Sequence, residues 1–268
     1  MVGRVLAAAT VAAGLCGSVR AEESRNNPAL FFETSESVRF WWTEIADFED
    51  KPKGWDSIVS PEIAASLRLV AGAFEATAEI GAVADRFDHF GKFDADSWRA
   101  LVAAGWNDGD WSYALEWETF DVYEPGYGMF YVGFDTYDIF IAKRFTANVL
   151  PDAPAGQFAA SFTAGIVEST WSPLDMHFAS LELEWTQSWG GNFSLAVAPK
   201  IEVDDFPHFS ARPRRDTVMS LKLAPSYAIG KHITLSLEGK ASFAVSTLPT
   251  KTGETWELTP VFRFQTAL

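Results

Sequence analysis

The sequence predicts an all-β protein: a transmembrane up-and-down antiparallel β-barrel of about twelve strands, preceded by a cleavable signal peptide. Three observations support this prediction. Apolar and polar residues alternate with a period of two in long segments. Aromatic residues gather at the ends of those segments, and tight turns alternate with longer polar connections. No stretch after residue 30 shows sustained helical periodicity or the roughly 20 apolar residues that a spanning helix needs.

Residues 1–21 have the features of a signal peptide. Arg4 gives a positive start, residues 5–15 form an apolar run rich in alanine, and small residues at Val19 and Ala21 precede the expected cleavage site. The single cysteine of the chain, Cys16, lies in this segment, so the mature chain has no disulfide. We expect an exported protein.

Beyond the signal, we expect residues 22–34 to form a periplasmic N-terminal segment and residues 35–268 to form the barrel. The chain of 268 residues carries a formal net charge of −15, which disfavours nucleic acid as a partner. It also contains 11 Trp and 22 Phe, many of them at segment ends. The twelve segments that alternate are 35–48, 58–70, 73–87, 97–107, 111–123, 129–145, 157–171, 176–189, 192–206, 216–229, 232–246 and 254–265.

The connections between these segments follow the order of an up-and-down sheet. Tight turns are expected at 70–73, 107–110, 190–192 and 230–232, and most of the other connections are longer and polar. Short and long connections therefore fall at opposite ends of the sheet. The connection at 146–156 does not fit, because it is long where a short turn is expected.

One face of each segment is apolar and the other is small, polar or charged. A soluble β-sandwich is the alternative, with its apolar face in a core. The long segments and the terminal aromatics favour a barrel with its apolar face toward lipid, because amphipathic rings prefer the membrane interface. The expected interface aromatics are Trp98, Trp106, Trp111, Trp185, Trp189 and Trp256.

If the apolar face meets lipid, the charged face lines the interior. Matching the apolar faces across the expected turns predicts four pairs of opposite charge: Arg68–Glu75, Arg99–Glu118, Glu182–Lys200 and Lys222–Glu238. The candidate lumen-lining residues are nine acids and six bases: Glu75, Glu79, Glu116, Glu118, Glu182, Glu184, Glu202, Glu238, Glu257, Arg68, Arg99, Lys200, Lys222, Lys240 and Arg263.

Three prolines lie within expected strands and each removes one backbone donor from a ladder. Pro199, Pro225 and Pro260 therefore predict bulges or local breaks in the sheet.

The export signal, the amphipathic strands, the aromatic ends and the final segment "WELTPVFRFQTAL" together resemble the outer-membrane β-barrels of Gram-negative bacteria. In that class the terminal strand is recognised by the barrel-insertion machinery and usually ends in an aromatic residue. Phe262 and Phe264 keep that phase here, whereas Leu268 replaces the final aromatic. The resemblance implies location in the outer membrane, with outer-membrane lipid and the insertion machinery as partners. No motif selects one family within the class.

Candidates for chemistry are few. His208 lies near Ser210 in a polar loop, a pair that occurs often by chance. Asp204, Asp205 and His208 offer ligands for a divalent cation, although such carboxylates are usually solvated. No phosphate-binding glycine loop or zinc-ligand spacing is present. We predict no catalytic residue, metal or cofactor. The basic run Arg212, Arg214 and Arg215 is expected in a solvated loop, with anionic head groups as the alternative contact.

The resulting functional prediction is a narrow, porin-like channel for small polar solutes with a weak preference for cations. The alternative is a non-conducting structural barrel in which paired charges fill the interior and long loops bind a partner. The remaining hypotheses are an outer-membrane lipid enzyme and a soluble periplasmic β protein. The solute and the oligomeric state are not encoded in any recognisable pattern.

Overall fold

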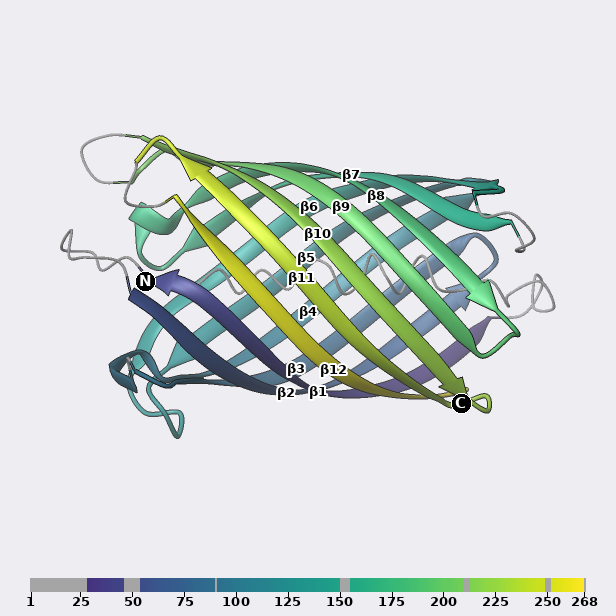
Figure 1. Ribbon diagram of the computed structural model, residues 1–268, viewed down its shortest axis with the longest axis horizontal. Coiled ribbons are helices and arrows are strands. Elements are labelled where there is room, and N and C mark those ends of the chain that lie inside the picture. The colour runs from purple at the N-terminus through teal and green to yellow at the C-terminus, as the bar shows by residue number, and fades with distance from the viewer. Residues whose placement is uncertain are drawn as a thin grey trace.

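The computed structural model describes residues 28–45, 54–89, 91–149, 155–209, 213–248 and 252–267. They form one closed antiparallel barrel in which each strand pairs with its sequence neighbours and β1 closes on β12 (Figure 1). This confirms the predicted fold class. The strands are β1 Ala29–Ile45, β2 Gly54–Ala71, β3 Phe74–Phe87, β4 Ala95–Asp108, β5 Trp111–Tyr123, β6 Phe130–Ala147, β7 Gly156–Ser169, β8 Met176–Trp189, β9 Phe193–Phe206, β10 Arg214–Ile229, β11 Ile233–Ser246 and β12 Gly253–Ala267.

Two short 3₁₀ turns, η2 at Gly91–Phe93 and η3 at Ser172–Leu174, lie in the connections after β3 and β7. Among the described residues, no helix has the length and apolar character needed to cross a bilayer. The first strand begins at Ala29, within the segment that we expected to precede the barrel. The expected signal peptide lies outside the described residues.

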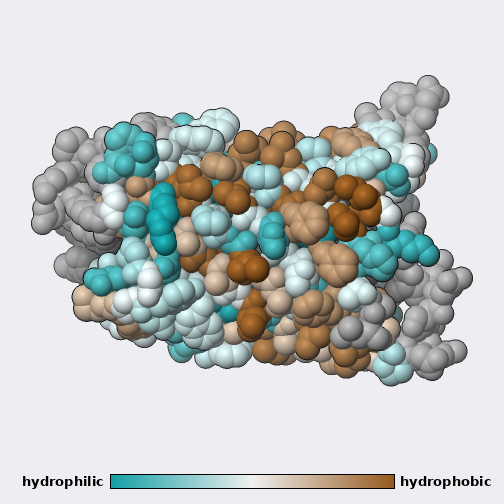
Figure 2. All heavy atoms as spheres, turned by 90° about the horizontal axis from the view of Figure 1, so that it is seen from below, coloured by the Kyte–Doolittle hydropathy of each residue, from teal (hydrophilic) through white to brown (hydrophobic). Residues whose placement is uncertain are grey.

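Alternate side chains of each strand face outward and inward, as the period of two requires. On β8, Leu181 and Leu183 are exposed on the outer face (58% and 42%), while Glu182 and Glu184 are half-buried on the inner face. Figure 2 shows hydrophobic side chains gathered on the outer surface, with hydrophilic ones most frequent toward the two ends. The exposed apolar face contradicts a soluble sandwich, because a sandwich would bury these residues.

One end of the barrel, the turn end, carries the connections β2–β3, β4–β5, β8–β9 and β10–β11. The β6–β7 connection, between Ala147 and Gly156, also lies at the turn end and is longer than the others there, as the sequence indicated. The other end, the loop end, carries the remaining connections. Gly72 and Gly109 open two-residue turns with φ of +64° and +59°, a conformation that a side chain disfavours. These two turns are shorter than predicted, because Ala71 and Asp108 stay in their strands.

The prolines are accommodated by local breaks in the ladder without a shift of register. Pairing between β8 and β9 runs to Glu182–Lys200 and resumes at Trp185–Val197, which skips Pro199. Pro225 is skipped in the same way between β10 and β11, and Pro260 between β12 and β1. All three side chains face outward, and so does a fourth such residue, Pro61 on β2. The expected local breaks are confirmed.

Candidate functional site: the barrel interior

All fifteen predicted lumen-lining residues lie on the inner face of their strands. Each alternates with exposed apolar residues on the outer face and is buried or half-buried. The interior is therefore charged along most of its height, as expected from the alternation in the sequence.

Arg99 on β4 is the centre of the most densely packed group of inner charges. Its guanidinium lies 2.8 Å from Glu62, 2.7 Å from Glu79 and 3.8 Å from Glu118, so it joins β2, β3, β4 and β5. Gly81 faces Arg99 in register, and a Cβ there would lie 3.1 Å from the Arg99 Nε atom. The absence of a side chain at Gly81 leaves space for the guanidinium of Arg99. A buried guanidinium with three carboxylates is held in place by charge from several directions.

The register of the two shortest hairpins differs from the prediction by two residues. Leu101, and not Arg99, lies opposite Glu118, and Val70 lies opposite Glu75. A shift of two residues keeps every side chain on its face, so matching apolar faces does not detect it. The ion pairs survive on the diagonal, since Arg68 is 3.5 Å from Glu75.

The other two predicted pairs also need correction. Glu182 lies opposite Lys200 as predicted, but the ion pair of Lys200, at 2.8 Å, is with Glu202 on its own strand. Lys222 lies opposite Lys240, which is two residues along β11 from Glu238. No ion pair joins Lys222 to Glu238 in the part of the chain that the structure describes. The charge partner of Glu238 is Arg263, at 3.6 Å, and Lys240 is 3.4 Å from Glu257.

The inner wall is not uniform around the barrel. On β3–β5 the charged side chains are packed, and Arg99 is only 3% exposed. On β11 and β12 the inner side chains are open to solvent: Lys240 is 40% exposed and Arg263 is 33% exposed. Water therefore reaches the interior mainly along β11 and β12.

Several inner charged residues were missed by sequence reasoning. They include Arg39, Glu62, Asp138 and Arg144, and these four keep the phase of their strands. Arg39 lies 3.8 Å from Glu62, which connects β1 to the Arg99 group. Strand phase was the available signal, but aromatic residues on both faces of the first and sixth segments obscured it.

The interior of the loop end is apolar, which the sequence analysis did not predict. Two clusters meet there at Phe134 on β6, which packs against both. We call this set the apolar inner layer; its members are Ala95, Phe120, Val122, Val132, Phe134, Val167, Leu174, Met176, Phe178, Phe206 and Phe209. It closes the side of the barrel that β4–β9 form, and it lies opposite the solvent-exposed wall.

The predicted interface aromatics all lie on the outer face. Trp106, Trp111 and Trp189 lie at the turn end, where Trp189 contacts Phe193 with ring centroids 5.6 Å apart. Trp98 and Trp256 lie toward the loop end. The remaining one, Trp185, keeps the outer phase of β8. Aromatic side chains toward both ends of an apolar outer surface are typical of a barrel that crosses a membrane.

The loop residues considered for chemistry do not converge. His208 lies 3.3 Å from Asp175, Asp204 faces inward and Asp205 faces outward, and Ser210 lies outside the described residues. The structure therefore does not bring these residues together as the ligands of one cation. In the basic run, Arg212 is also outside the described residues. Arg214 stacks on Phe206 with its guanidinium carbon 4.6 Å from the ring centroid, so it is not a solvated loop residue.

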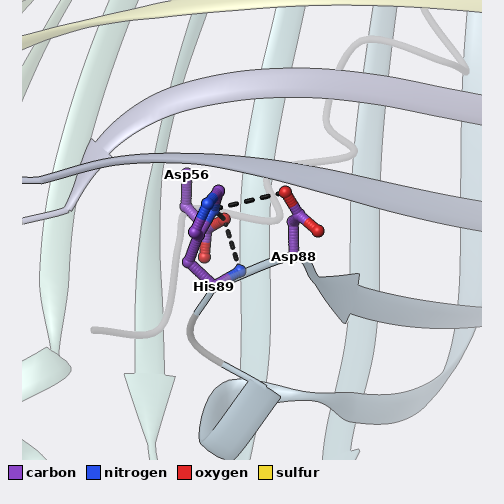
Figure 3. Close-up of side chains that lie close together, drawn as sticks. All are labelled: Asp56, Asp88 and His89. Carbon is purple, nitrogen blue, oxygen red and sulfur yellow. Dashed lines mark hydrogen bonds and ion pairs between the residues drawn. The ribbon is translucent and has the colours of Figure 1, made fainter.

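A different group of potential metal ligands lies at the loop end, where β2 meets the β3–β4 connection (Figure 3). The Nδ1 atom of His89 is 3.2 Å from Asp56 and 3.3 Å from Asp88. The Asp56 carboxylate is buried and accepts the backbone N–H groups of Ser57 and His89. These contacts hold the connection to β2, so we assign this group a structural role.

No family model matches this chain, and no curated protein matches it. Among solved structures, an outer membrane channel from Pseudomonas putida F1 is similar with a TM-score of 0.58, at 8% identity, over 91% of this chain and 98% of that chain. This chain has the fold of an outer-membrane β-barrel. The β domain of the Bordetella autotransporter BrkA has a TM-score of 0.48, at 12% identity, covering 89% of this chain and 99% of that one. The KdgM porin has a TM-score of 0.46, at 10% identity, covering 86% of this chain and 98% of that one.

Proposed function

We propose that this protein is an outer-membrane channel for small polar solutes with a weak preference for cations. In this proposal residues 1–21 direct export, and the barrel contacts outer-membrane lipid after insertion by the cell's barrel-insertion machinery. The single observation that supports conduction best is the solvent exposure of charged inner side chains along β11 and β12. Acids outnumber bases on the inner face, which attracts cations.

The route for solutes is the inner wall along β11 and β12. The opposite wall is closed by the Arg99 group and, at the loop end, by the apolar inner layer. A solute that passes along these strands meets the carboxylates of Glu238 and Glu257 beside the cationic groups of Lys240 and Arg263. Such a lining favours small hydrated solutes over apolar ones, because its polar groups take the place of some of the water molecules that hydrogen-bond to the solute.

Planar-bilayer recording of the purified mature protein tests this proposal. We expect steady current steps and, in a KCl gradient, a reversal potential displaced toward that of K⁺. The double variant Glu238→Gln/Glu257→Gln removes two inner acids from β11 and β12 and should reduce that displacement. The matched control, Glu168→Gln/Glu254→Gln, removes two exposed acids from the outer face and should leave it unchanged.

The packed wall and the apolar inner layer favour a second candidate, a non-conducting barrel whose loops bind a partner. A correctly folded protein that inserts into the bilayer and carries no current would support this candidate. It would also overturn the channel proposal. Folding is checked independently by the heat-dependent shift in electrophoretic mobility that closed barrels show.

A further inference from the structure

Glu36 is an exposed acidic side chain on the outer face of β1, midway along the strand. Its register partners are Phe262 on β12 and Ile63 on β2, and both are exposed on the same face. Between residues 30 and 42 the rest of the outer face of β1 is apolar apart from the neighbouring hydroxyl of Thr34; its other residues there are Leu30, Phe32, Val38, Phe40 and Trp42.

This position is unusual for the molecule. Within the described strands, the other acidic and basic side chains on the outer face lie toward strand ends, where the membrane interface supplies water. They are Arg86, Asp96, Asp108, Asp121, Asp135, Lys143, Glu168, Asp205, Arg215 and Glu254. Glu36 alone among the described outer residues places a carboxyl group in the middle of the apolar band. Hydrocarbon offers that group no hydrogen-bond donor.

The backbone beside Glu36 is also incompletely paired. The β1–β12 ladder runs to Ser37–Val261 and resumes at Phe40–Leu258. Pro260 lies in the gap, and it has no N–H to donate across the seam. An unpaired backbone group is costly at this depth, because lipid cannot replace the missing partner. The carboxyl of Glu36, the hydroxyl of Thr34 and this gap therefore form one polar patch on the lipid-facing surface.

We propose that a second copy of this chain covers this patch, in a two-fold dimer with Glu36 and Thr34 at its centre. The proposal rests on membrane location but not on conduction. Both copies insert in the same direction, so the two-fold axis of a dimer is parallel to the membrane normal. Each residue on the axis then meets the other copy at its own depth.

That symmetry is what identifies the occupant. A different partner would need its own polar group at the depth of Glu36, whereas a second copy brings one automatically. The Glu36 carboxyl meets the same carboxyl and the Thr34 hydroxyl of the other copy. The two carboxyl and two hydroxyl groups together hold both donors and acceptors, so the four groups can satisfy one another. Phe40 and Phe262 supply apolar contact area around them.

Cross-linking through a single cysteine tests the geometry. The variant Ile63→Cys places a thiol beside Glu36 and keeps the Glu36 carboxyl; it is made in a Cys16→Ser background, reconstituted in lipid vesicles and oxidised with copper phenanthroline. We expect a disulfide-linked dimer to form rapidly. The matched control is Leu181→Cys, which presents an exposed outer-face residue midway along β8, on a distant part of the barrel. It should cross-link at least tenfold more slowly.

A second measurement separates polar contact from simple proximity. The dimer dissociation constant is measured by analytical ultracentrifugation for the wild type, Glu36→Gln and Glu36→Leu. Glu36→Gln keeps hydrogen bonding and should stay close to the wild type, whereas Glu36→Leu should raise the constant at least tenfold. A wild-type monomer overturns the proposal, and so does a dimer that Glu36→Leu leaves intact. Cross-linking of Ile63→Cys to a different protein in native membranes overturns it as well. A silent barrel that dimerises would reject only the channel function.

Discussion

Lys222 on β10 and Lys240 on β11 lie directly opposite each other on the inner face of the barrel. Like charges at such positions repel, because opposed side chains of neighbouring strands lie close together. Lys240 has Glu257 at 3.4 Å, whereas no ion pair of Lys222 occurs within the part of the chain that the structure describes. The solvent-exposed wall therefore carries a local positive site within an interior that is acidic as a whole.

Replacing Lys222 with Glu should convert a repulsive pair into an attractive one. We expect stability to rise by roughly 0.2–1 kcal/mol, the range of cross-strand pairs. The reversal potential should also move further toward that of K⁺, because an inner base becomes an acid. Urea unfolding and bilayer recording measure the two effects. The control is Lys231→Glu in the β10–β11 turn. A channel whose selectivity responds equally to both variants would contradict this assignment of the conducting wall.

Arg99→Gln should destabilise the barrel strongly. The substitution leaves Glu62, Glu79 and Glu118 close together without the guanidinium that lies between them. Removing one partner from a buried ionic group costs about 3–5 kcal/mol. Urea unfolding in lipid vesicles measures the loss. Arg215→Gln is the control, because its ion pair with Asp205 is exposed and contributes at most about 1 kcal/mol. Similar losses in the two variants would contradict a special role for Arg99.

Gly165 on β7 has no room for a side chain. A Cβ there would lie 2.5 Å from the Tyr137 carbonyl oxygen and 2.6 Å from the Asp138 Cβ, so the backbone would have to move. We expect Gly165→Ala to cost about 1–3 kcal/mol, the usual range for overpacking. At Gly239 on β11 the nearest atom to a Cβ is 3.9 Å away, so Gly239→Ala should be tolerated. Comparison of the two unfolding midpoints checks the prediction.

Phe134→Ala should loosen the loop end. Phe134 is half-buried and packs against both parts of the apolar inner layer, so its truncation should cost less than the about 3–5 kcal/mol of a fully buried phenylalanine. The resulting space lies inside the barrel, so single-channel conductance should rise as stability falls. The control is Phe243→Ala, which removes an exposed ring from the outer face of β11. Unchanged conductance in a folded Phe134→Ala protein would show that the layer does not restrict the passage.

Most of the barrel could be predicted from sequence because its side chains alternate with a strict period of two. Leu181, Glu182 and Leu183 differ so clearly in hydrophobicity that their two faces follow without coordinates. The same period hides the register: Leu101 replaces Arg99 opposite Glu118, and every side chain stays on its face. The apolar inner layer escaped prediction because an inward Phe134 has the same sequence signature as an outward phenylalanine.

The sequence by itself determined that the chain forms long amphipathic strands with an apolar outer face, since hydrophobicity and strand geometry are local properties. It also determined fifteen of the inner charges, including the two lysines on β10 and β11. Only the tertiary structure decided which charges meet, that Lys222 opposes Lys240 and that Arg99 holds three acids. It also placed Glu36 beside the gap left by Pro260. Those relationships depend on closure of the sheet and on register, and both are set by pairing between strands that are distant in the chain.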